Sequence, residues 1–171
     1  MPMAIIFQVQ MMLGYVAWLV WLLSYGLPRA RTMPPEAVHR AIATLHGFRF
    51  FGLVFIVPGV VGPHLPAGFA VYAAYGDFVT GLLALLALIT FRVRPLFWAF
   101  TVAFNVTGVY DLLGNYYHAM RLGLPEVAGD LGAAYVIPVI YVPLLMITHV
   151  LALYRLFRQA RDGATRVAIA A

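Results

Sequence analysis

The chain has 171 residues, of which 64% are hydrophobic and only 10% are charged. A typical soluble domain is about half apolar and about a quarter charged, so a water-soluble core of this size cannot bury so much apolar surface. We therefore expect lipid to surround most of the chain, which requires apolar runs of about 20 residues. The sequence contains no cysteine, which excludes disulfides, thiolate metal sites and cysteine nucleophiles.

Apolar runs follow one another along the chain, separated by short segments that contain proline, glycine or arginine. Each run is long enough to cross a bilayer as a helix at about 1.5 Å per residue. The expected spans are residues 5–27, 41–61, 67–90, 96–117 and 131–157. We predict an all-α, polytopic membrane protein, a compact bundle of five transmembrane helices forming a single domain over residues 1–171. Because the connections are short, neighbouring helices should be antiparallel.

The basic residues are all arginines, and they fall in alternate loops. They are Arg29, Arg31 and Arg40 after the first span, Arg92 and Arg94 after the third, and Arg155, Arg158, Arg161 and Arg166 in or after the fifth. The other two loops contain Arg121 alone. The positive-inside rule then predicts an outer amino terminus and a cytoplasmic carboxyl terminus, and we expect a bacterial inner membrane. The partners expected for the arginine-rich tail are anionic membrane lipids, with no nucleic acid.

Three polar residues fall near the middle of their spans. Counted from the helix starts, Arg49, Asp77 and Asn105 each lie roughly 12 to 15 Å into a hydrocarbon core about 30 Å thick. An ionisable side chain there costs at least about 2.5 to 3.5 kcal/mol and is a functional hypothesis by default. In one interpretation Arg49 and Asp77 neutralise each other and Asn105 satisfies a remaining donor. In the other, the three line a cavity for a polar or anionic ligand, or form a proton relay.

Asp111 and Asn115 share one face of the fourth span because they are four residues apart. They lie toward its outer end. A solvated helix mouth explains them, and an outward-facing binding vestibule is the alternative.

His46 and His149 lie in the cytoplasmic halves of their spans and could face one another. Two imidazoles at matching depth are how membrane four-helix cytochromes hold haem b. The alternative is an ordinary hydrogen-bonded pair in the core. Haem b is the only cofactor that the sequence suggests.

Pro138 and Pro143 interrupt the fifth span. Each lacks an amide donor and frees the carbonyl four residues earlier, at Ala134 and Val139. Freed carbonyls at membrane depth must be buried in protein or line water. They mark either a substrate site in a broken helix or a kink that serves packing.

No nucleophile elbow, phosphate loop or metalloprotease motif is present, and no metal-ligand spacing, so an enzyme is the less favoured class and no metal site is predicted. We expect the protein to bind or transport a small molecule or ion through an inward polar cluster. The cluster consists of Arg49, Asp77, Asn105, Asp111 and Asn115. A structural or accessory subunit of a larger membrane complex is the second hypothesis, and a haem-binding or catalytic protein is the third. The sequence leaves homo-oligomers open.

Overall fold

The computed structural model describes the backbone of residues 1–170 and the side chains of residues 1–162, so the side chain of Arg166 lies outside it. That part of the chain is all-helical and contains no strand, which confirms the predicted class. In chain order, the elements are α1 (Met3–Trp21), η1 (Leu22–Gly26), α2 (Leu27–Thr32), α3 (Pro35–Gly47), η2 (Phe48–Ile56), α4 (Ala67–Ile89), α5 (Arg94–Arg121), η3 (Leu124–Tyr135), η4 (Ile137–Tyr141) and α6 (Val142–Ala170). The segments η1 and η4 are π-helical, whereas η2 and η3 are 3-10 helices.

Four helical stretches are long and apolar enough to cross a membrane, which is consistent with a multi-pass membrane protein. They are Met3–Thr32, Ala67–Ile89, Arg94–Arg121 and Ile137–Asp162. The expected second span is built differently, because α3 gives way to the 3-10 helix η2 at Phe48 and helical structure ends at Ile56. Residues 57–61, which we expected to be helical, lie in turns instead.

Two other expected boundaries are wrong. The first helix does not stop at Leu27 but continues as α2 to Thr32. The fifth span does not start as a regular helix at Leu131, because Gly132 has φ 54° and ψ −129° inside the 3-10 segment η3. A left-handed glycine breaks the helical hydrogen-bond pattern, so the continuous helical stretch begins only at Ile137.

Each π-helical segment precedes a proline by the same offset. The segment η1 ends two residues before Pro28, and η4 ends two residues before Pro143. A proline ring clashes with the carbonyl four residues earlier, here those of Ser24 and Val139. Both carbonyls lie within the π turns, which widen the helix and let it continue past the proline.

Helix α1 contacts two backbone carbonyls in the π turn η4, which precedes Pro143. The Trp18 indole Nε1 donates a hydrogen bond to the Ile140 carbonyl at 2.9 Å. Gly14 lies against the Val139 carbonyl, leaving no room for a side chain at this position. The interrupted helix therefore packs against α1 at this point.

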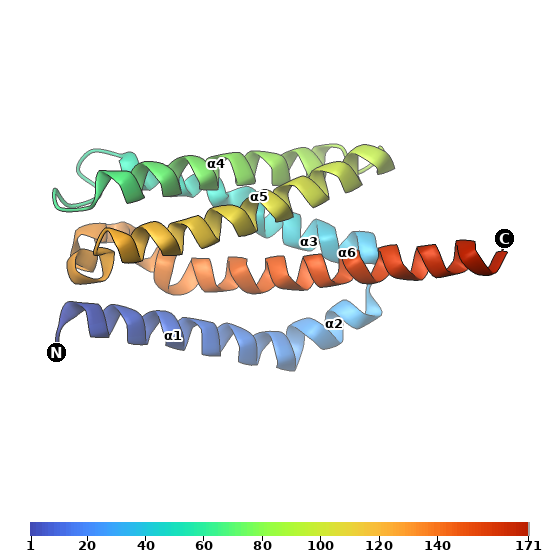
Figure 1. Cartoon of the computed structure of the whole chain (residues 1–171), viewed down its shortest axis with the longest axis horizontal. Helices are drawn as coiled ribbons and strands as arrows, with labels where there is room; N and C mark the ends of the chain where they lie inside the picture. The colour runs from blue at the N-terminus through green and yellow to red at the C-terminus, as the bar shows by residue number, and fades with distance from the viewer. Residues whose placement is uncertain (171) are drawn as a thin grey trace.

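The long helices lie side by side, and the two chain ends are at opposite ends of the bundle (Figure 1). The turn between α2 and α3, the turn between α4 and α5, and the later half of α6 share one end, which we call the arginine end. Three contacts connect them: Arg94 to Glu36 at 2.9 Å, Arg40 over the Phe91 ring at 4.3 Å, and Arg155 Nη1 to the Ala30 carbonyl at 3.0 Å.

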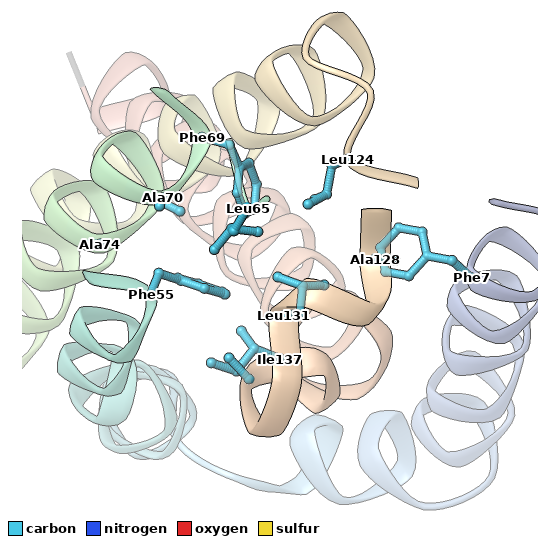
Figure 2. Packing of buried hydrophobic residues seen from close by; sticks show 12 residues of the cluster. Phe7, Phe55, Leu65, Phe69, Ala70, Ala74, Leu124, Ala128, Leu131 and Ile137 are labelled. Carbon is cyan, nitrogen blue, oxygen red and sulfur yellow. The ribbon is translucent and has the colours of Figure 1, made fainter. Parts of the chain in front are cut away.

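Two buried apolar clusters lie at different depths in the bundle. The first joins α1, η2, α4, η3 and η4, and includes Phe7, Phe55, Phe69, Leu124, Leu131 and Ile137 (Figure 2). The second lies nearer the arginine end and includes Val38, Ile42, Ala84, Ala87, Phe97 and Phe104. On α4, Asp77 falls between Ala74 of the first cluster and Ala84 of the second. A polar layer therefore separates the two apolar clusters.

We predict that Gly132→Ala lowers stability by about 1 to 3 kcal/mol or more, because a β-carbon would occupy a backbone conformation that L-residues avoid. It would also meet the Val60 carbonyl. Thermal unfolding in detergent measures the loss. Gly129→Ala is the matched control, since its β-carbon would meet only Met3 Cε, at 3.5 Å. Equal melting temperatures for the two variants would contradict the prediction.

Candidate functional site

Arg49 is fully buried because of the helix type that carries it. The buried residues of η2 are Arg49, Gly52 and Phe55, which are three residues apart. A 3-10 helix has three residues per turn, so residues at this spacing share one face. An α-helix would rotate the three away from a common direction. The 3-10 geometry thus aligns Arg49 with the inward face of the segment.

Two carboxylates share the Arg49 guanidinium. Its Nε donates to Asp77 Oδ1 on α4 at 2.7 Å, and its Nη2 donates to Asp111 Oδ2 on α5. The side chains of the two aspartates are 7% and 4% exposed. The pairing of Arg49 with Asp77 agrees with our expectation from depth.

The position of Asp111 differs from the solvated helix mouth considered from the sequence. Asp111 is 3% exposed and belongs to the same buried group as Asp77. Depths counted along helix axes left it about a turn and a half away, but the Arg49 side chain is long and its guanidinium donates in several directions. One arginine therefore joins η2, α4 and α5.

The third guanidinium nitrogen faces a histidine. Arg49 Nη1 lies 3.2 Å from His149 Nε2, and His149 Nδ1 lies 2.9 Å from Asn105 Oδ1. Because arginine can only donate, His149 accepts at Nε2 and donates from Nδ1, which makes it neutral. Asn105 in turn donates to the Thr101 carbonyl at 2.8 Å. One interpretation of the sequence had Asn105 accept the remaining Arg49 hydrogen bond. In the structure His149 accepts it instead, and Asn105 contacts His149.

The fifth predicted residue, Asn115, lies on the outer side of the group. Its Nδ2 donates to Asp111 Oδ2 at 3.1 Å. The second oxygen of Asp111 and the amide oxygen of Asn115 are buried and have no hydrogen-bond partner among the described residues. Asp111 thus retains an acceptor that the protein does not satisfy.

Three glycines make room for the charged side chains. A β-carbon at Gly52 would overlap Asp77, one at Gly76 would overlap Asp111, and one at Gly108 would overlap both His149 and Arg49. From the sequence, small residues such as these indicate only close helix approach. In the structure they determine how near the ionised groups come to one another.

His46 and His149 lie side by side, with ring centroids 4.0 Å apart and planes inclined by 44°. His46 Nε2 is 3.0 Å from the Thr148 hydroxyl, while its Nδ1 is buried without a partner among the described residues. A bis-histidine haem needs its porphyrin plane between the two imidazoles. Atoms about 3.5 to 4.0 Å apart are already in contact, so these rings leave no space for that plane. The two residues do not fit haem in this arrangement.

A narrow cavity of about 60 Å³ borders the group on the side away from the arginine end. Its walls are mostly apolar, and the polar residues on them are Gln8, Asp77, Asn115 and Tyr116. The Tyr116 hydroxyl is hydrogen-bonded to that of Tyr15, which joins α5 to α1. A volume of this size holds a few water molecules. Asp77 and Asn115 therefore border a small, mostly apolar cavity that Gln8 and Tyr116 also line.

The group has unequal charges when all its members are ionised. Arg49 contributes one positive charge and Asp77 and Asp111 contribute two negative charges, while His149 is neutral in the tautomer that its contacts require. A buried charge without compensation costs several kcal/mol. The geometry therefore calls for one additional positive charge at the carboxylates.

Residues 6–157 match a family described as a domain of unknown function (DUF8737). The chain belongs to the DUF8737 family. Arg49, Asp77, Asp111 and His149 all lie within the matched residues. No curated protein and no solved structure matches the chain.

We predict that Arg49→Gln costs this DUF8737 protein about 3 to 5 kcal/mol, because it leaves two buried carboxylates without their partner. Asp77→Asn should cost less, since Asp111 still balances Arg49. The Arg49→Gln and Asp77→Asn double variant should lose less than the sum of the two. Thermal unfolding in detergent gives all three values.

Arg94→Gln is the control for these measurements, because the Arg94–Glu36 pair is exposed and such pairs contribute about 0 to 1 kcal/mol. If the losses of Arg49→Gln and Asp77→Asn simply add, the two residues do not interact.

Proposed function

We propose that this protein binds a proton at the Arg49–Asp77–Asp111 cluster and uses it to move a small molecule or ion across a bacterial inner membrane. One observation supports this most directly: a single buried guanidinium serves two buried carboxylates. The surplus negative charge favours a bound cation, and a proton is the cation that needs no space of its own. Intramembrane carboxylates paired in this way are typical of proton pathways.

Polar groups on both sides of the cluster support a pathway rather than an isolated ion pair. On one side is the narrow cavity that Asp77 and Asn115 border. On the other side are His149, Asn105 and the His46–Thr148 pair. Along α5 the polar residues run from Thr101 to Asn115, which is about 21 Å at 1.5 Å per residue. This covers most of a hydrocarbon core about 30 Å thick.

Arg49 divides this pathway into two halves. Its guanidinium has only donors and cannot accept a proton, so a proton crosses this level only when the cluster rearranges. A proton arriving at Asp111 would instead neutralise that carboxylate and weaken its ion pair with Arg49. The contact between Arg49 Nη2 and Asp111 on α5 could then break. Proton binding and a rearrangement of η2 against α5 are in this way coupled, as the binding step of a transporter requires.

The proposal includes five crossings, with the arginine end in the cytoplasm and the amino terminus outside. The positive-inside rule gives this orientation. The crossing that needs justification is α3 with η2, which has 13 and 9 residues. At about 1.5 Å per α-helical residue and about 2.0 Å per 3-10 residue, this segment is roughly 37 Å long, enough for one passage.

Reporter fusions after Glu36 and after Glu126 should report opposite sides of the membrane, the first cytoplasmic and the second external. Three crossings separate the two positions if the segment containing α3 and η2 passes through the bilayer. Only two separate them if it does not. Reporters on the same side would therefore eliminate the five-crossing arrangement.

Asp111→Asn should abolish proton movement while leaving the protein folded, because the remaining Arg49–Asp77 pair is balanced. The measurement uses proteoliposomes with an internal pH-sensitive dye and a step to acidic external pH. Wild-type protein should acidify the lumen faster than protein-free liposomes, and Asp111→Asn should not. Glu126→Gln, an exposed acid in η3, is the control and should behave as wild type. Wild-type rates in Asp111→Asn, or no acceleration by the wild type, would contradict the proposal.

A further inference from the structure

A large groove separates α1 and α2 from α6 near the arginine end, away from the charged cluster. Its volume is about 790 Å³. Leucines of the first two helices and apolar residues of α6 form most of its walls: Leu19, Leu22 and Leu27 face Ile147, Val150 and Leu151. In the view of Figure 1, α1 and α2 bend away from α6 and approach it again toward the turn into α3.

The groove lies between two sets of contacts that hold α1 and α2 against η4 and α6. Toward the outer end, Gly14 lies against Val139 and Trp18 donates to the Ile140 carbonyl. At the arginine end, Arg155 Nη1 donates to the Ala30 carbonyl at 3.0 Å. The π turn η1 lies between these two contacts and lets the helix bend there. The groove is thus a bounded feature of the fold with one open side.

Charge is concentrated at one end of this groove. Arg31, Arg155 and Arg158 line it there, and among the described lining residues the one acid is Asp162, which lies 3.9 Å from Arg158 Nε in an exposed pair. Among the other lining residues, Tyr15, Tyr154 and Gln159 carry polar groups, and the rest are apolar. A ligand that matches both parts must carry a negative group at one end and a long apolar portion.

We propose that the groove holds an anionic phospholipid from the leaflet at the arginine end. The phosphate would lie among Arg31, Arg155 and Arg158, and an acyl chain would lie between the leucines of α1 and α2 and the apolar residues of α6. Arginines at the membrane surface attract anionic headgroups, and guanidinium groups match phosphate oxygens.

The open side of the groove favours a lipid over a soluble anion. Leu19 and Val150, which line it on α1 and α6, are 44% and 60% exposed, so the groove opens among side chains that suit the hydrocarbon of a bilayer. A free phosphate would use the arginines but not the apolar walls. The volume lies within the range of about 300 to 1,000 Å³ that small-molecule sites occupy.

The test is native mass spectrometry of the purified protein released from nanodiscs that contain equal amounts of phosphatidylglycerol and phosphatidylcholine. Wild-type protein should retain phosphatidylglycerol preferentially. Arg31→Gln should lower this retention about fivefold, the effect of one arginine near an anionic surface. Val150→Trp fills the apolar part without changing charge, and it should lower retention as well. Unfolding temperature verifies that each variant is folded.

Arg92→Gln is the matched control, because Arg92 is an exposed arginine at the same end of the bundle and does not line the groove. It should retain phosphatidylglycerol as the wild type does. Equal retention of the two lipids by wild type, or an equal loss in Arg92→Gln and Arg31→Gln, would overturn the proposal. Displacement of the lipid by added inorganic phosphate would also overturn it, since the site would then recognise the anion alone.

Discussion

The Arg49 guanidinium between Asp77 and Asp111 is the interaction on which the rest of this structure depends. It joins three elements, η2, α4 and α5, at a depth where an unpaired charge is costly. The 3-10 form of η2 aligns Arg49 with Gly52 and Phe55, and glycines on η2, α4 and α5 let the ionised groups approach. The 3-10 helix and the three glycines thus both allow one buried network of ion pairs to form.

The two apolar clusters on either side of the network strengthen its electrostatics. Phe55 and Phe69 belong to one cluster, and Phe97 and Phe104 to the other. Charges in such surroundings interact more strongly than they do in water, since the local dielectric constant is low. The same surroundings make an imbalance of charge expensive, and two aspartates against one arginine are such an imbalance. The proton that we propose at the carboxylates therefore depends on the packing as much as on the residues themselves.

The sequence predicted the class of the fold and the pairing of Arg49 with Asp77. The length of an apolar run and the depth of a residue along it can be counted without knowing how the helices pack. It failed for Asp111. Depth counting assumed regular α-helices, whereas η2 rises about 2.0 Å per residue and the arginine side chain reaches beyond its own level. His149 was considered only with His46, since nothing in the spacing shows that it faces Arg49.

Helix boundaries failed for a related reason. We expected the first helix to end at Leu27, but the π turn η1 lets the helix continue past Pro28. Gly132 breaks the expected fifth span through its left-handed conformation, and the Val60 carbonyl lies where a β-carbon would be.

Infrared spectroscopy of the purified protein at neutral pH tests most directly whether the cluster carries a proton. A protonated carboxyl group has a carbonyl absorption distinct from that of a carboxylate. The wild type should show a protonated carboxyl band that is absent from both Asp77→Asn and Asp111→Asn, since each substitution leaves one carboxylate for one guanidinium. A wild-type spectrum with ionised carboxylates alone would contradict the account, and so would a band that survives in both variants.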